Sequence, residues 1–340
     1  MATAARRLAT RLDGWAAKVY RPIGFTKPYN FILWFLSTSG LFGFVLSRLP
    51  YLNYDGVFCA PITEHTDRHL HPAPGECYYH QRGHTRVGML MHLATILPAG
   101  LLVCLQFVPF IRHRWILLHR IVGYLVILLS FASTAGAFMV VRFSFGGDPD
   151  TQVFLGVLGS VFLLALALAY INIKRLQIEQ HRKWMLRAWF YACSIITLRV
   201  ISILGTPVMT RTGTYYTARA CKIVDDIMHN NQSLALAFYP DCQAWYNGTD
   251  PEQFVLVHGD AKGNPVEAIA AAGMMFSAAG WLALTLHAIG IEIYLQLTPA
   301  EHERLRNVSY QRQVQAGMNH PGRAGLTADR LGDSATWRPE

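Results

Sequence analysis

The feature that most constrains this chain is a set of six apolar stretches. About 20 consecutive apolar residues are needed for a helix to cross the hydrocarbon core of a bilayer, and each stretch is at least that long. They cover residues 29–49, 87–110, 117–141, 153–173, 184–204 and 266–297. We therefore expect an all-α fold, namely a polytopic integral membrane helix bundle with about six transmembrane helices.

The composition agrees with a membrane protein. Of the 340 residues, 52% are hydrophobic and 15% are charged, whereas soluble domains carry about 25% charged residues. The formal net charge is +9, which in a soluble protein would suggest a nucleic-acid partner. Here most Lys and Arg residues lie next to the apolar stretches, as the positive-inside rule describes. The lipid bilayer is therefore the predicted partner, and we expect no nucleic acid.

The distribution of Lys and Arg also predicts the topology. Most of them fall on the side that holds both ends of a six-span chain, so both termini are expected to be cytosolic. Residues 1–28 form a cytosolic basic arm, and residues 29–297 form the six-span membrane domain. Its two outer loops are residues 50–84 and 205–265. Residues 298–340 are polar, rich in turn residues and without periodicity, so we expect a disordered cytosolic tail.

The outer loops hold four of the six cysteines: Cys59, Cys77, Cys221 and Cys242. An even number of thiols in an oxidising compartment predicts two disulfides. Pairing within each loop is the most local arrangement. Four cysteines allow three connectivities, and their spacing does not choose among them.

Two glycosylation sequons lie in the second outer loop, at Asn231-Gln-Ser and Asn247-Gly-Thr. They predict a glycoprotein of the secretory-pathway or plasma membrane. A third sequon, Asn307-Val-Ser, falls in the tail and should remain unmodified if the tail is cytosolic.

Basic, histidine-bearing segments open two outward-going helices, at His119-Arg120 and His181-Arg182. Two helix N-termini side by side favour an anion such as a phosphate, a carboxylate or a haem propionate. His287 is expected near the same depth, and facing imidazoles hold a b-type haem. These five residues are candidates for a haem or anion site, with haem b as the cofactor to test. The alternative is that the arginines reach lipid headgroups and the histidines lie at the interface.

Among the residues of the apolar stretches, Arg199 has the highest expected free-energy cost of burial in the bilayer. It lies twelve residues after Arg187, about 18 Å deeper along a helix. An ionised group at that depth needs a partner inside the bundle. His92 should reach a similar depth, and Glu267 opens the last stretch. We expect these three residues, Arg199, His92 and Glu267, to form a buried polar site with a catalytic role. The alternative is a structural salt bridge between spans.

Several short elements resemble one family. They are His92 followed by an apolar run, His119-Arg120-x-x-Gly-Tyr, Phe145-Gly-Gly, His181-Arg182-x-Trp-Met-x-Arg and Thr197-Leu-Arg199. Together they resemble DUF2306, a family of predicted polytopic membrane proteins, in a fungal type of elaboration. The resemblance covers roughly residues 85–205 and implies several spans with intramembrane His and Arg. It implies no established activity.

Three functions remain open from the sequence. The first is a b-type haem electron-transfer or reductase-like protein with a redox partner. The second is a membrane enzyme or binding protein for a lipophilic small molecule, using His92, Arg199 and Glu267. The third is a transporter or scaffold. The sequence contains no Walker loop, dinucleotide fingerprint or Gly-x-Ser-x-Gly elbow that would direct the choice elsewhere.

Overall fold

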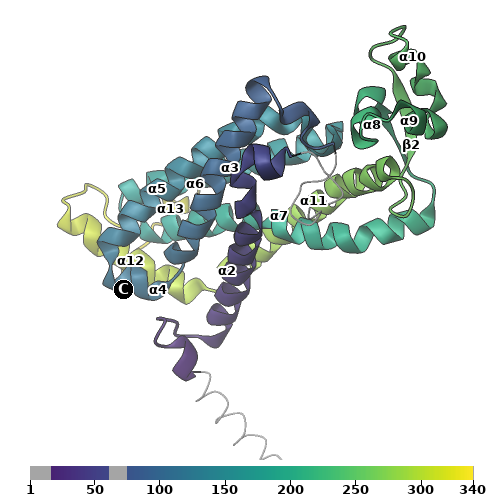
Figure 1. Ribbon diagram of the computed structural model, residues 1–340. Helices are drawn as coiled ribbons and strands as arrows, with labels where there is room; N and C mark the ends of the chain where they lie inside the picture. Colours follow the sequence, from purple (N-terminus) through teal and green to yellow (C-terminus); the bar gives the residue numbers. More distant parts are fainter. Residues whose placement is uncertain (1–16, 61–74, 340) are drawn as a thin grey trace, which may run out of the picture. The chain divides into compact units, whose positions relative to one another are not determined.

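The computed structural model describes residues 17–60 and 75–339. Across these residues it contains six helices that are long and apolar enough to cross a membrane. They are α2 (Pro28–Arg48), α3 (Gly83–Gln106), α5 (Ile116–Val140), α6 (Pro149–Lys174), α7 (Ile178–Thr212) and α11 (Pro265–Gln296) (Figure 1). The prediction of an all-α polytopic membrane protein with six spans is confirmed.

The chain folds as two compact units. The first holds α2, α3, the short helix α4 (Pro109–Arg114) and most of α5. The second holds the segment just before α3 and everything from residue 138 onward. The second unit also contains Arg199 and Glu76.

Small residues bring the helices of the first unit close together. A Cβ atom at Gly100 of α3 would lie 2.7 Å from the side chain of Val45 in α2. A Cβ atom at Gly136 of α5 would lie 2.5 Å from the carbonyl oxygen of Gly88 in α3. Helices in lipid gain little from hydrophobic burial, so close backbone approach at small residues drives much of their association.

The described part of the N-terminal arm lies against α4. The backbone N–H of Phe110 donates to the carbonyl oxygen of Ile23 at 3.1 Å. Gly24 has φ 100°, and a Cβ atom there would lie 3.0 Å from the side chain of Pro109. Residues 1–16 of the predicted arm lie outside the described residues.

Helices α6, α7 and α11 form the helical body of the second unit, and α7 packs against both of the others. Figure 1 shows α7 and α11 running side by side. Their shared core includes Phe154, Leu198 and Phe276. Gly280 of α11 makes room for the Phe154 ring, because a Cβ atom there would lie 2.5 Å from that ring.

A small folded insertion joins α7 to α11, where we predicted a long polar loop. It contains a two-stranded antiparallel sheet of β1 (Tyr216–Ala220) and β2 (Phe254–His258), in which Ala218 pairs with Leu256. Its helical elements are α8 (Cys221–Ile227), α9 (Gln232–Phe238), η6 (Pro240–Cys242) and α10 (Gln243–Tyr246). Helix α7 also runs eight residues beyond the predicted end at residue 204, with Pro207 inside it. In Figure 1 the insertion lies at the ends of α7 and α11.

A disulfide between Cys221 and Cys242 fastens this insertion. Both cysteines are buried in its core together with Val224, Val257 and Val266. Cys59 and Cys77 are disulfide-bonded as well, whereas Cys104 and Cys193 form no disulfide with any residue that the structure describes. The prediction that the four loop cysteines form disulfides is therefore confirmed.

The C-terminal segment differs from the predicted disordered tail. Residues Pro299–Gln315 form helix α12, and Ala328–Leu331 form the short helix α13. Helix α12 packs against α7. The residues of α12 that face inward are Leu305, Ser309 and Gln313, all of which are buried.

A buried polar network accounts for this order, and Gln177 in the α6–α7 connection is its centre. The Gln177 amide nitrogen donates to Glu179 at 2.6 Å and to the Gly322 carbonyl at 3.0 Å. Its amide oxygen accepts from the side chain of Gln313 at 2.9 Å and from the backbone of Gly325 at 2.8 Å. A polar segment is ordered here because its buried amides are all paired.

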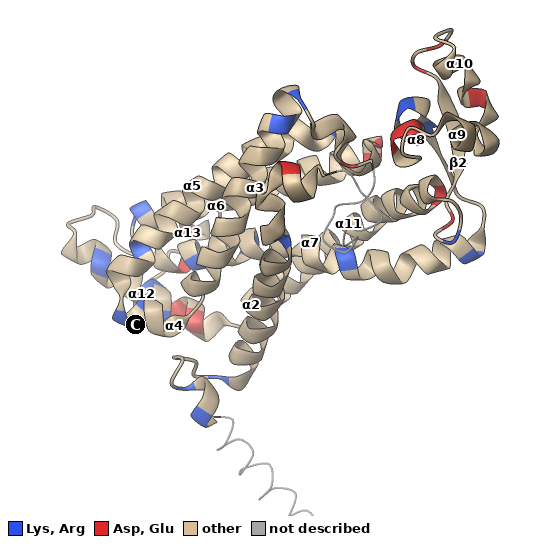
Figure 2. Ribbon diagram, viewed as in Figure 1, with Lys and Arg blue, Asp and Glu red and all other residues tan. Residues whose placement is uncertain are grey.

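Charged residues of the second unit gather at the helix ends, in the insertion and in the C-terminal segment. Figure 2 shows the long helices as mostly uncharged between these regions, with isolated Lys or Arg residues on α7. Arg199 is one of these exceptions, and its surroundings define the site.

Candidate functional site

Three successive residues of α7 point in different directions. Leu198 is fully buried in the core of the second unit. The hydroxyl of Thr197 lies 2.7 Å from Nε2 of His287 in α11. Arg199 points to an aromatic pair: its guanidinium carbon lies 4.8 Å from the ring centroid of Phe145 and 5.2 Å from that of Phe276. Contact with aromatic faces stabilises a cation removed from water.

The two rings are themselves stacked, with centroids 3.8 Å apart and planes 14° apart. Phe276 comes from α11. Phe145 comes from the short helix η5 (Val141–Gly146), which ends the α5 span. Arg199 therefore joins three separate elements of the second unit through one aromatic pair.

Phe145 reaches this position through an unusual backbone. It has φ 50° and ψ 40°, the left-handed region that costs a residue with a side chain roughly 1 kcal/mol. Gly146 and Gly147 follow with φ 97° and 71°. Asp148 is then the N-cap of α6, and Pro149 is its first residue. We call residues Phe145–Gly147 the Phe145 corner.

Glu76 meets the same corner. Its carboxylate accepts a hydrogen bond from the backbone N–H of Phe145 at 3.2 Å. Burial raises the pKa of Glu76 to about 7, although the Phe145 N–H and the positive charge of Arg199 both act to lower it. A carboxyl with a pKa near neutrality can exchange a proton at cellular pH.

A buried arginine of the insertion also reaches the corner. The side chain of Arg219 in β1 is 7% exposed and forms an ion pair with Asp148 at 3.3 Å. It also approaches the corner itself, because a Cβ atom at Gly146 would lie 2.7 Å from Nη1 of Arg219. Gly273 of α11 is similarly close, with a Cβ position 3.0 Å from Nη2. The insertion is thus tied to the corner by charge and by close packing.

The predicted partners of Arg199 have other contacts. Glu267 completes a capping box at the start of α11: the Asn264 side chain accepts from the Glu267 backbone N–H, and the Glu267 carboxylate accepts from the Asn264 backbone N–H. His92 lies in the first unit, where Nδ1 is 3.0 Å from the Ser133 carbonyl oxygen and 2.9 Å from the Ser133 hydroxyl. The grouping of His92, Arg199 and Glu267 stays a prediction.

Glu76 is not among the site residues predicted from the sequence. It lies in a loop rich in Pro and His, where no helical or strand periodicity indicates a buried side chain. Its contact with Phe145 joins residues that are 69 positions apart. No local pattern distinguishes Glu76 from the other polar residues of this loop.

The histidines proposed for haem are engaged with the protein. Nδ1 of His287 lies 2.6 Å from the Phe190 carbonyl oxygen, so Nδ1 carries the proton and Nε2 accepts from Thr197. Nδ1 of His181 lies 3.0 Å from the Ala169 carbonyl oxygen. Iron needs a free imidazole nitrogen as its ligand, and His287 would offer one only after losing the Thr197 bond. His119 and Arg120 lie at the start of α5 in the first unit.

The predicted anion residue Arg182 donates to the Tyr294 hydroxyl at 3.2 Å. One helical turn further, Arg187 forms a bidentate ion pair with Glu292 of α11, at 2.6 and 2.9 Å. This pair ties α7 to α11 near the end opposite the insertion.

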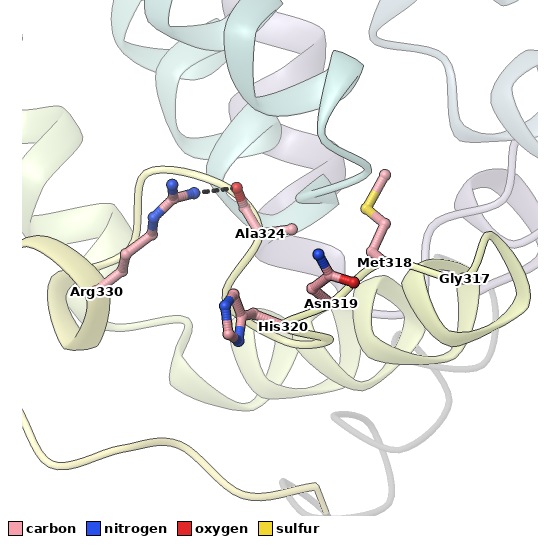
Figure 3. A pocket seen from close by; sticks show the side chains of 6 residues that line it. All are labelled: Gly317, Met318, Asn319, His320, Ala324 and Arg330. Atoms are coloured by element: carbon pink, nitrogen blue, oxygen red, sulfur yellow. Dashed lines mark hydrogen bonds between the residues drawn. The ribbon is translucent and has the colours of Figure 1, made fainter.

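A shallow hollow lies on the C-terminal segment (Figure 3). It is lined by Gly317, Met318, Asn319, His320, Ala324 and Arg330. The Arg330 guanidinium donates to the Ala324 carbonyl oxygen. None of the residues predicted from the sequence as site residues lines this hollow.

Comparison with known proteins matches one part of the chain to a family. Residues 89–226 match the family described as "Predicted membrane protein (DUF2306)". This region belongs to the DUF2306 family. The DUF2306 region includes the Phe145 corner, Arg199 and Arg219, whereas Glu76 and Phe276 lie outside it.

A relative with a curated description extends beyond the DUF2306 region. It is a protein of Aspergillus versicolor described as "Ava biosynthesis cluster protein G". The two sequences are 23% identical over 332 residues, covering 84% of this chain and 94% of the relative. No solved structure matches the chain.

Proposed function

We propose that this membrane protein binds a lipophilic small molecule at the Arg199 site and catalyses a proton transfer on it. The observation that carries the proposal is that the Phe145 corner, which Arg199 contacts, also binds Glu76, a carboxyl whose pKa is raised to about 7 and which the charge of Arg199 influences. A cation next to a group that exchanges protons at neutral pH is suited to acid–base chemistry on an oxygen-bearing substrate.

The two residues would have distinct roles. Arg199 would bind a carbonyl or enolate oxygen and stabilise negative charge that develops on it. Glu76 would accept or donate the proton. Glu76 replaces Glu267 in this role, because the Glu267 carboxylate caps α11.

The surface of α7 supports access from the bilayer. Val200 and Ile203, which flank the Arg199 turn, are 54% and 73% exposed. Apolar side chains exposed on a spanning helix face lipid, so a lipophilic molecule dissolved in the bilayer reaches this helix without crossing water. The name of the relative, a biosynthesis cluster protein, agrees with a role in small-molecule metabolism. The disulfides and the two sequons of the insertion support a secretory-pathway or plasma membrane location.

The test compares Arg199→Gln and Glu76→Gln with Arg211→Gln, an exposed arginine on the same helix. Lipid-soluble extracts of cells producing each variant are profiled by mass spectrometry. The wild-type protein and Arg211→Gln should change the extract in the same way, and both site variants should abolish that change. Size-exclusion chromatography monitors the amount of folded protein. A change that survives both site substitutions, or a loss that follows the amount of folded protein, would contradict the proposal.

The haem alternative is tested by a separate measurement, the absorption spectrum of the purified protein. A b-type haem protein with a redox partner would show a strong Soret band when purified from haem-replete cells, with a shift on reduction. Because both ring nitrogens of His287 are hydrogen-bonded, we expect no Soret band that depends on His287. A stoichiometric Soret band that disappears in His287→Ala would favour the electron-transfer function instead.

A further inference from the structure

A group of basic side chains lies at the end of the second unit opposite the insertion. It consists of Arg182, Lys183 and Arg187 from the first turns of α7, and His302 and Arg306 from α12. We call it the shoulder cluster. Helix α12 packs against α7, so the two sets of side chains belong to one surface.

Two of these charges are neutralised by carboxylates. Arg187 pairs with Glu292 at 2.6 Å, and Arg306 pairs with Asp329 at 2.7 Å. The Asp329 side chain is only 2% exposed. These two arginines are therefore structural.

The other two cations have no carboxylate partner. Arg182 donates to the neutral Tyr294 hydroxyl and lies over its ring at 5.6 Å. Lys183 forms no ion pair with any residue that the structure describes. Both side chains are partly exposed, so an incoming anion can reach them.

The nearby carboxylates are already engaged. Glu179 accepts from Gln177 at 2.6 Å and from Ser309 at 2.7 Å. Glu303 accepts from the indole N–H of Trp337 at 2.9 Å. The positive charge of Arg182 and Lys183 is thus left without a direct partner.

The positive charges of this cluster also affect His302. Its pKa is lowered to about 4, first by burial and then by the charges of Lys183, Arg306 and Arg182, with Glu303 acting in the opposite direction. The imidazole is neutral at cellular pH. The cations around it are therefore close enough to act together.

We propose that Arg182 and Lys183 bind the phosphate group of an anionic phospholipid headgroup at the membrane surface. The residues lie where α7 enters the apolar span, next to Trp184, whose ring lies 4.6 Å from the Arg187 guanidinium. Tryptophan favours the headgroup level of a bilayer. Arginine binds phosphate oxygens in a fork, and lysine adds a mobile point charge. The inference is independent of the function proposed for Arg199, which lies 16 residues beyond Lys183 along α7.

The test uses the full-length protein in detergent, titrated with short-chain phosphatidylserine, phosphatidylglycerol or phosphatidylcholine. Binding is measured by native mass spectrometry. The double variant Arg182→Gln/Lys183→Gln is compared with Arg211→Gln/Lys262→Gln, which removes the same charge from exposed positions at the insertion end. Glycerol phosphate provides the headgroup chemistry without acyl chains.

The wild-type protein should bind the anionic lipids in preference to phosphatidylcholine. The shoulder variant should lose about fivefold in affinity for each residue removed, and the control variant should bind as the wild type does. Competition by glycerol phosphate at millimolar concentration would show that the phosphate group itself is recognised, and stronger binding of the lipid would identify the lipid as its source. Equal affinity of both double variants for anionic lipid would overturn the proposal, as would tighter binding of glycerol phosphate than of lipid.

Discussion

The backbone N–H of Phe145 donates a hydrogen bond to the carboxylate of Glu76 at 3.2 Å. This contact brings a loop carboxyl to the corner that holds Arg199 against two stacked rings. It links a titratable group to the backbone geometry of the site, and it leads to a pH dependence that can be measured.

The first prediction concerns that pH dependence. The pKa of Glu76 is raised from 4.5 to about 7 in the folded protein, so protonation favours the folded state. This stability is fully present below about pH 4.5 and is lost as the pH rises through about 7. The loss of stability is at most about 3 kcal/mol. Solvent screening reduces it further, because the Glu76 side chain is partly exposed. Thermal unfolding in detergent from pH 5 to 8 should show a decline that Glu76→Gln reduces.

Other titrating groups contribute to both curves equally, so the difference between wild type and Glu76→Gln isolates this carboxyl. Identical pH profiles for the two proteins would show that the Glu76 pKa is not raised.

The second prediction concerns the polar network under the C-terminal segment. Gln177→Ala removes an amide that makes four buried hydrogen bonds. Because its partners are left unpaired in a buried site, the substitution should lower stability by about 3 kcal/mol. The control is Gln243→Ala, an exposed glutamine with one bond to Asn247, which should cost about 0.5 kcal/mol or less. Limited proteolysis of the C-terminal segment gives the readout. Equal resistance of both variants would mean that the network does not hold the segment.

The third prediction compares two glycines of α11. A Cβ atom at Gly280 would lie 2.5 Å from the ring of Phe154, whereas one at Gly290 would meet nothing within 4 Å. Gly280→Ala forces the ring and the α6–α11 packing apart, and should destabilise the protein by about 1–3 kcal/mol. Gly290→Ala should be neutral or stabilise by up to about 1 kcal/mol. The two melting temperatures in the same detergent are the measurement. A Gly280→Ala protein as stable as Gly290→Ala would contradict the close packing at Phe154.

The fourth prediction concerns modification and topology. Asn231 and Asn247 are exposed on the insertion, and their side-chain oxygens accept hydrogen bonds that leave the amide nitrogens outside those bonds. Both should carry N-linked glycans. The Asn307 sequon contains Ser309, which is buried and donates to Glu179 at 2.7 Å, so Asn307 should carry none.

Gel mobility with and without glycosidase treatment tests this pattern in single Asn→Gln variants. Loss of a mobility step in Asn231→Gln and Asn247→Gln, but not in Asn307→Gln, places the insertion in the lumen or outside the cell. A glycan on Asn307 would reverse the predicted topology.

The spans were predictable because each depends on a local property, a continuous apolar run. The C-terminal end of α7 was less predictable. Pro207 suggests that the helix ends before it, yet the helix continues to Thr212. A proline inside a membrane helix is tolerated where neighbouring groups satisfy the freed carbonyl. The sequence predicts a loop for the insertion because its strands and helices are each seven residues or shorter.

Helix α12 was missed for a physical reason. Its buried stripe, Leu305, Ser309 and Gln313, has the four-residue spacing of a helix face. Two of these three residues are polar, so hydrophobic periodicity does not reveal the face. They are buried because Glu179, Gln177 and the Arg175 carbonyl provide partners. Such partners come from a distant part of the chain, as does the contact of Glu76 with Phe145, and no local pattern predicts them.

The dependence of Gln177 on Gly322 and Gly325 also has a consequence for biosynthesis. These bonds join positions 145 and 148 residues apart. During translation, α6 and α7 enter the membrane while the segment that satisfies their connecting turn has not yet been synthesised. The Gln177 side chain therefore stays hydrated, or is bound by a chaperone, until residues 322 and 325 have been synthesised. A ribosome that stops after α11 would release a chain with every span inserted and this turn still open, a species that cellular quality control can recognise.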